Sequence, residues 1–222
     1  PDARPTGIEY VIVNGVTANL NAANTYLGPT IITSIVANDG IVNANVANAL
    51  PTANGRTAVR MDAAGAGGST LNIGGSLGFP LGANQSAASL TGAATSKVTL
   101  GANTLPLGFT APANGDPNAN FAGVISSGAG VGGIIKDGAS TQIFSGANTY
   151  TGSTTVNGGI LQAGIANVAF GVNSPVTIGA AGTLELAGFN NTIGSLAGAV
   201  GGVVRTTGAN ATARSNVSLL WP

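Results

Sequence analysis

Residues 144–161 read FSGANTYTGSTTVNGGIL, and this stretch decides the fold. Its short runs of apolar and β-branched residues are separated by Gly and Asn. Both residue types tolerate the left-handed backbone that tight corners need, so each marks a point where a short strand ends. Nothing in the stretch repeats with the 3.6-residue period of an amphipathic helix. It therefore predicts short β-strands joined by tight corners.

A related stretch lies earlier in the chain. Residues 23–26 read ANTY, as do residues 147–150, an offset of 124 positions. Further matches follow in the same order, and their offset only shrinks, because the first copy holds extra loop residues. We interpret the pattern as two copies of a roughly 110–120-residue unit within one continuous solenoid. Residues 1–140 form the first unit with an N-terminal cap strand, and residues 141–222 form the second, shorter unit with a C-terminal strand.

A finer rhythm of short strands runs through the first copy. The strands that we expect there are Ile31–Val36, Gly40–Ala44, Ala58–Met61, Thr70–Ile73 and Lys97–Leu100. Alternation of apolar and polar residues at 98–100 and 184–186 places one strand face inward. Residues 105–119, with three prolines, are expected to form a long loop. The fold class predicted is all-β, a parallel β-helix or β-solenoid, with asparagine side chains that stack in ladders at its corners.

The composition limits the classes of function. Only 6% of the residues are charged, and seven Lys and Arg balance seven Asp and Glu. Phosphate binding needs clustered Lys and Arg, so this neutrality argues against nucleic acid as a partner. The chain has no His, which excludes a Ser-His-Asp triad, and no Cys. No run of about 18 apolar residues occurs, so no transmembrane helix is expected.

Two patterns could indicate chemistry. Residues 128–133 fit G-x-G-x-x-G, but residues 134–138 are expected to form a strand and turn, not the helix of a dinucleotide site. We therefore expect no cofactor, no metal site and no catalytic residue. The carboxylates are scattered and are interpreted as turn and loop residues: Asp2, Glu9, Asp39, Asp62, Asp116, Asp137 and Glu185. Only Asp39 and Asp62 could meet across neighbouring coils, which leaves a glycan-processing β-helix enzyme as the alternative.

Residues 144–161 resemble the passenger-associated β-strand repeat of bacterial autotransporters, and residues 121–128 resemble the segment that precedes it. The resemblance covers most of residues 85–210 and, more weakly, residues 14–78. Leu27 and Pro29 depart from it, because they replace small polar residues. The resemblance implies a right-handed β-helix in a protein that is extracellular or on the bacterial cell surface. It implies a scaffold and no enzyme, since the repeat occurs beneath many different functions.

The two ends of the chain carry its most strand-like segments with aromatic residues. An open solenoid end must be capped or it pairs with a neighbour. We therefore expect a structural or adhesive stalk, filament or matrix subunit that binds copies of itself end to end. Cell-surface glycans or a host surface are further candidate partners. The candidate self-association residues are Tyr10, Val11, Val13, Leu219, Leu220 and Trp221.

Overall fold

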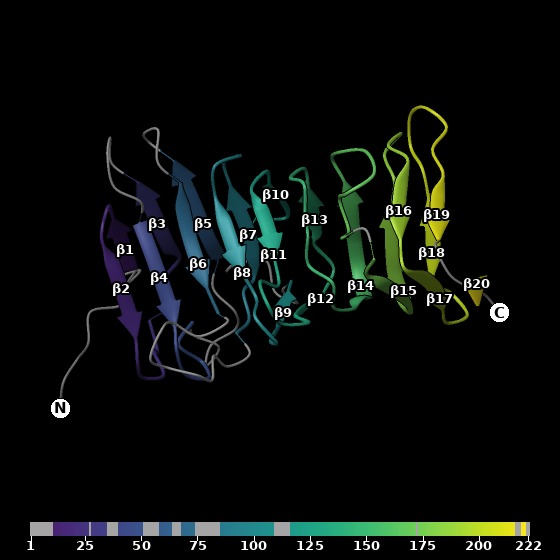
Figure 1. Ribbon diagram of the computed structural model, residues 1–222. Coiled ribbons are helices and arrows are strands. Elements are labelled where there is room, and N and C mark those ends of the chain that lie inside the picture. Colours follow the sequence, from purple (N-terminus) through teal and green to yellow (C-terminus); the bar gives the residue numbers. More distant parts are fainter. Residues whose placement is uncertain are drawn as a thin grey trace.

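The computed structural model is a β-solenoid in which each turn of the chain lies on the previous one (Figure 1). It describes residues 11–26, 28–34, 40–50, 58–63, 68–73, 85–108, 116–171, 173–215 and 219–220. Within these ranges there is no helix. All strand pairings in the same ranges are parallel. The expected fold class, an all-β solenoid of stacked parallel strands, is confirmed.

The strands are short, except for two that continue around a corner. The first ten are β1 (Val11–Asn14), β2 (Thr17–Leu20), β3 (Thr30–Ser34), β4 (Gly40–Ala44), β5 (Ala58–Ala63), β6 (Ser69–Asn72), β7 (Ser89–Gly92), β8 (Lys97–Thr99), β9 (Thr104–Leu107) and β10 (Asn118–Phe121). The others are β11 (Val124–Ser126), β12 (Gly133–Lys136), β13 (Thr141–Phe144), β14 (Thr154–Ala163), β15 (Pro175–Glu185), β16 (Asn191–Ile193), β17 (Ser195–Gly198), β18 (Val203–Arg205), β19 (Ala213–Ser215) and β20 (Leu219–Leu220).

The pairings arrange these strands on three faces. Face one is the ladder β1–β3–β5–β7–β10–β13, continued by residues 160–163 of β14, by the end of β15 and by β18. Face two is the ladder β2–β4–β6–β8–β11, with β16 and β19 further along. Face three is β9–β12, then residues 154–156 of β14, residues 175–178 of β15, β17 and β20. The long strands β14 and β15 therefore turn the corner from face three to face one.

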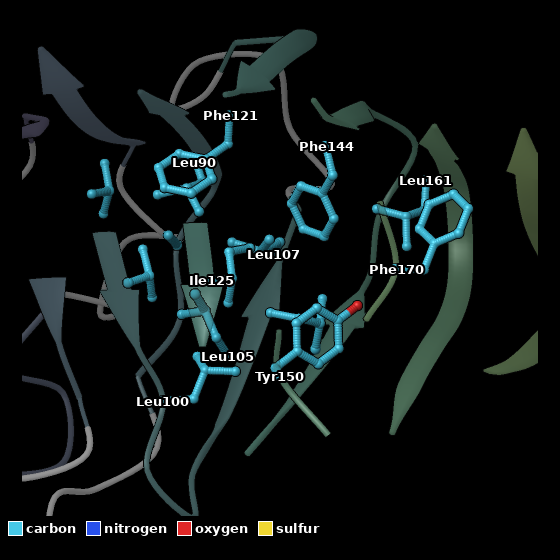
Figure 2. Packing of buried hydrophobic residues seen from close by; sticks show 14 of the residues in the cluster. Leu90, Leu100, Leu105, Leu107, Phe121, Ile125, Phe144, Tyr150, Leu161 and Phe170 are labelled. Atoms are coloured by element: carbon cyan, nitrogen blue, oxygen red, sulfur yellow. The ribbon is translucent and has the colours of Figure 1, made fainter. Parts of the chain in front are cut away.

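Side chains that point inward from the three faces form one continuous hydrophobic core. The alternating burial of β9, β13 and β16 follows from the two-residue period of a strand. In the middle of the rod the aromatic rings of Phe121, Phe144, Tyr150 and Phe170 lie inside, among leucines (Figure 2). Each interior layer lies between the layers of the coils before and after it, so every coil depends on its neighbours for burial.

Glycine occupies corners where the backbones of successive coils approach each other closely. A Cβ atom built on Gly146 would lie 1.7 Å from the carbonyl oxygen of Gly123 in the preceding coil. One built on Gly152 would lie 2.4 Å from the oxygen of Gly132. Contacts below 3 Å cannot be accommodated without moving backbone, so these corners exclude any side chain.

Gln142 and Lys136 are two of the buried polar residues. Gln142 reaches back two coils, where its Oε1 accepts from the Leu90 amide at 3.0 Å and its Nε2 donates to the Leu90 carbonyl at 2.8 Å. Strand β10 pairs with β7 at one position only, Phe121 with Gly92. The Gln142 carboxamide therefore bonds the Leu90 backbone groups in place of a β10 residue. Lys136 is fully buried, and its Nζ donates to the carbonyls of Asp137 at 2.6 Å and Gly158 at 3.3 Å.

The predicted strands are confirmed, and the predicted loop at residues 105–119 is partly wrong. The five strands expected in the first copy are present as β3, β4, β5, β6 and β8, and residues 35 and 36 of the first lie outside the described residues. The segment expected as a loop contains the end of β9 and the start of β10. Leu105 and Leu107 are fully buried, so burial favours a strand in spite of Pro106 between them. The Pro106 carbonyl accepts from the Ala87 amide, and Ala87 belongs to no strand but pairs with Leu107 through an isolated bridge. The N–H group that proline lacks would face this sparsely paired segment, so the sheet tolerates proline there.

The corners at Tyr26 and Tyr150 make matching contacts. Each tyrosine hydroxyl bonds a threonine hydroxyl four residues later, Thr30 in the first case and Thr154 at 2.7 Å in the second. The side-chain amide of the asparagine two residues before each tyrosine donates to the next coil, at 2.8 Å and 2.7 Å. The strand after Tyr26 belongs to face one, whereas residues 154–156 belong to face three. The two corners are therefore alike locally but lie on different sides of the rod.

Candidate interaction surfaces at the two ends

The structure places four of the six candidate self-association residues, two at each end of the solenoid. Val11 and Val13 lie in β1 at one end, and Leu219 and Leu220 lie in β20 at the other (Figure 1). Tyr10 and Trp221 lie outside the described residues. The two groups are thus not brought together within one molecule, which is the arrangement that an end-to-end contact requires.

The N-terminal end presents two strand edges. Among the described residues β1 pairs only with β3, and β2 pairs only with β4. Ala18 and Leu20 of β2 point toward the core but are only half-buried, because no described coil covers them. Neither β1 nor β2 contains a charged residue. An uncharged open edge with apolar residues beside it is suited to pairing with another strand.

Asparagine side chains form two ladders that end at β2. In the first, Asn43 Nδ2 donates to Asn19 Oδ1 at 2.8 Å, and Asn72 Nδ2 donates to Asn43 Oδ1 at 3.3 Å. In the second, Asn45 Nδ2 donates to Asn21 Oδ1 at 2.8 Å. Asparagines do stack, but not at the corners where they were expected, because Asn19, Asn43 and Asn72 lie within strands of face two. Sequence analysis did not single out these residues. The repeated N-x-N spacing at residues 19–21 and 43–45 is the signal that could have found them.

The C-terminal end presents the edges of β18, β19 and β20. Within the described part of the chain each pairs on one side only, with β15, β16 and β17. Arg205 at the end of β18 and Arg214 in the middle of β19 are both exposed. Charged side chains on edge strands discourage pairing with another chain. The two ends of the solenoid therefore differ in character, with an uncharged N-terminal edge and a basic C-terminal one.

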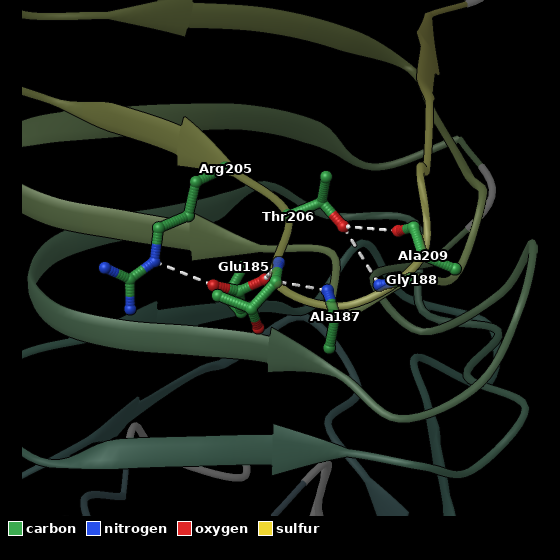
Figure 3. A network of polar contacts seen from close by, with 7 residues as sticks. Glu185, Ala187, Gly188, Arg205, Thr206 and Ala209 are labelled. Atoms are coloured by element: carbon green, nitrogen blue, oxygen red, sulfur yellow. Dashed lines mark hydrogen bonds and ion pairs between the residues drawn. The ribbon is translucent and has the colours of Figure 1, made fainter.

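Glu185 fastens the last coil to the coil before it (Figure 3). Its carboxylate accepts from the backbone amides of Ala187 and Thr207, each at 2.8 Å, and from Arg205 Nε at 2.7 Å. Burial raises the pKa of this carboxyl, but the two amides and Arg205 outweigh burial, so the pKa lies below its usual value. The alternation at residues 184–186 had placed Glu185 on the exposed side, yet these contacts cover it almost completely.

The other described carboxylates for which partners are resolved also hold the fold together. Asp116 Oδ1 accepts from the Asn118 amide at 2.9 Å, and Asp137 Oδ1 accepts from Asn157 Nδ2 at 3.0 Å. Asp39 lies outside the described residues, so the possible pair with Asp62 has no described geometry. The turn and loop roles predicted for Asp116 and Asp137 are confirmed.

The glycine pattern at residues 128–133 leads into β12, a strand, as predicted. The chain turns at residues 127–132, where Gly130 donates to the Ser127 carbonyl at 3.1 Å. In the portion that the structure describes, no three His, Cys, Asp or Glu side chains gather where they could hold a metal ion. That portion also contains no helix long and apolar enough to cross a membrane.

The fold and its open ends define a parallel β-solenoid protein, and comparison with known proteins makes the likeness more specific. Residues 134–163 match the family described as passenger-associated-transport-repeat, and this match contains the stretch at 144–161. The adhesin BmaC autotransporter of Brucella suis biovar 1 (strain 1330) is 39% identical over 89 residues. Those residues are 40% of this chain and 2% of the adhesin, so the chain spans a small part of that relative. No solved structure matches the chain. The resemblance to autotransporter passengers is confirmed.

Proposed function

We propose that this chain is a non-enzymatic, adhesive or structural segment of a bacterial surface passenger, located outside the cell or on its surface. The observation that carries the proposal is the uninterrupted parallel solenoid across residues that match a passenger repeat. Each coil needs its neighbours for burial, so the chain forms an elongated scaffold. Similarity to an autotransporter adhesin supports the adhesive role.

The structural use of the carboxylates favours a scaffold over the alternative, a glycan-processing enzyme. Glycosidases need two carboxyl groups that flank one bond, with one pKa raised so that it can donate a proton. Glu185 instead has a lowered pKa and accepts from three donors. Asp116 and Asp137 bond to groups of their own fold.

End-to-end association of copies is the second part of the proposal. The open edges of β1 and β2 at one end and of β18, β19 and β20 at the other support it, since parallel strand edges can continue a sheet. A head-to-tail contact that does not close produces a filament. Cell-surface glycans and host surfaces remain candidate partners of the lateral faces.

A binding experiment tests the adhesive role. Beads that carry the purified chain should bind to host-cell monolayers or to immobilised cell-surface glycans. Beads that carry a Gly146→Val variant, whose solenoid cannot close at that corner, serve as the unfolded control. Equal binding by both kinds of bead would contradict the proposal, as would release of reducing sugar ends from any glycan by the folded chain. Sedimentation velocity over a range of concentrations tests self-association, and a monomer at all concentrations would exclude it.

A further inference from the structure

Where the donor is assigned, hydrogen bonds that join two side chains of neighbouring described coils run in one direction along the rod. In both asparagine ladders the later coil donates and the earlier coil accepts. The same direction holds for Thr33 Oγ1, which donates to Asn14 Oδ1 at 2.9 Å, and for Ser145 Oγ, which donates to Asn120 Oδ1 at 2.7 Å. Because a carboxamide carries its oxygen and its NH₂ group on opposite sides, a ladder built this way has a donor end and an acceptor end.

The N-terminal end is the donor end. Asn14, Asn19 and Asn21 all direct their side-chain oxygens to the following coil. Their NH₂ groups make no hydrogen bond to any described residue. Asn19 and Asn21 lie on the exposed side of face two, beside the open edge of β2 and two residues apart. These two side chains and the edge form what we call the amide edge, defined as residues 17–21.

We propose that the amide edge is a docking site for a parallel β-strand that carries side-chain oxygens, from Asn or Asp, at two positions two residues apart. The backbone of such a strand would pair with β2, as β4 does on the other side. Its side-chain oxygens would accept from the NH₂ groups of Asn19 and Asn21. The strand would also cover Ala18 and Leu20, which are only half-buried. The inference rests on the proposed function as a segment of a longer stalk and names the kind of coil that joins this end.

On face two the C-terminal coil of a second copy offers no such oxygens, so the end-to-end contact of copies proposed above would rest on the strand edges and not on these two amide groups. On this face that coil would present β19, whose outward residue is Arg214. A guanidinium group only donates hydrogen bonds, so it cannot accept from Asn19. An acceptor-bearing strand is the matching occupant, and the chain itself holds one example in residues 40–46, GIVNANV, which contain the N-x-N of β4.

Peptide titration into the isotope-labelled full chain tests the proposal by NMR. The GIVNANV peptide should shift the backbone amides of residues 14–21, and the Asp version, GIVDADV, should bind at least as tightly because charge-assisted bonds are stronger. The double variant Asn19→Ala with Asn21→Ala should weaken binding at least about tenfold. Asn118→Ala, which alters an exposed asparagine on β10, is the matched control and should leave the affinity unchanged.

Three results would overturn the proposal. The first is no shift of residues 14–21 with either peptide. The second is equal binding of a lysine version, GIVKAKV. The third is equal binding of a peptide of residues 211–216, ATARSN, which would show that the amide edge does not select strands that carry side-chain oxygens. None of these results bears on bead adhesion, so failure of the docking site and failure of the proposed function are distinguishable. Melting curves of both variants confirm that they remain folded.

Discussion

The corner at residues 146–154 and the corner at residues 22–30 share their hydrogen bonds but not their burial. Asn148 is fully buried and Tyr150 is 1% exposed, whereas Asn24 and Tyr26 are only partly buried. The first corner has described coils on both sides, and the second belongs to the first described coil. The comparison teaches that the local sequence specifies the corner, and that stacking determines how much free energy the corner contributes.

The largest expected effect is at the position two residues before each corner asparagine, which is Gly146 in one corner and Ala22 in the other. Gly146→Ala should destabilise the protein by about 4 kcal/mol or more, because the new Cβ would meet the Gly123 carbonyl at 1.7 Å. The matching residue in the other corner is Ala22, so a Cβ is already accommodated there, and Ala22→Gly should cost at most about 1 kcal/mol. Denaturant unfolding measures both. Similar losses at the two positions would contradict the role that we assign to stacking.

The next effect concerns the asparagines. Asn148 Oδ1 accepts from the Ile125 amide at 2.8 Å, and its Nδ2 donates to the Ala169 carbonyl. Asn148→Ala leaves both buried backbone groups without these partners and should cost about 3 kcal/mol. Asn24→Ala, at a partly exposed site, should cost about 1 kcal/mol or less. If the free energies of unfolding of the two variants are equal, burial does not distinguish the corners.

The tyrosine hydroxyls should give a smaller difference. Tyr150→Phe removes one buried hydrogen bond and should cost about 1 kcal/mol, more than Tyr26→Phe. Burial raises the pKa of Tyr150, with a partial offset from the hydroxyls of Thr154 and Ser174. The protein should therefore lose stability above about pH 10, because the Tyr150 hydroxyl ionises there in the unfolded chain but stays protonated in the folded one. Tyr150→Phe should lessen this alkaline loss more than Tyr26→Phe, which unfolding curves at pH 8 and pH 11 would measure.

Glu185 extends the comparison to the C-terminal end, where its carboxylate joins the last described coil to the coil before it. Its lowered pKa stabilises the fold in full above the unfolded value of about 4.3, and this contribution is lost as the pH falls through the folded pKa. Glu185→Gln should cost about 1 kcal/mol at neutral pH, a modest value because the Arg205 side chain is 48% exposed. The difference between the variant and the parent should shrink as the pH falls from 5 to 3. A difference that persists unchanged at pH 3 would rule out a role for the carboxylate charge.

Sequence patterns were reliable where a residue's role depends on its immediate neighbours. The five strands expected in the first copy follow from short apolar runs that end in Gly, Asn or Asp. Patterns failed where a partner lies coils away. Pro106 suggested a loop, but the burial of Leu105 and Leu107 outweighs one missing donor. Glu185 appeared to be an exposed strand residue, and only its contacts with Thr207 and Arg205 cover it.

The sequence by itself determined that this chain is a stack of short parallel strands with glycine and asparagine corners, because strand period and corner conformation are local properties. Tertiary structure alone decided which face each strand occupies and which side chains meet. Coil length varies, from 19 positions between the paired residues Thr141 and Ile160 to 31 between Ala58 and Ser89. The face on which a corner lies depends on every corner before it. Like corners therefore lie on different faces, and Gln142 bonds a residue 52 positions away.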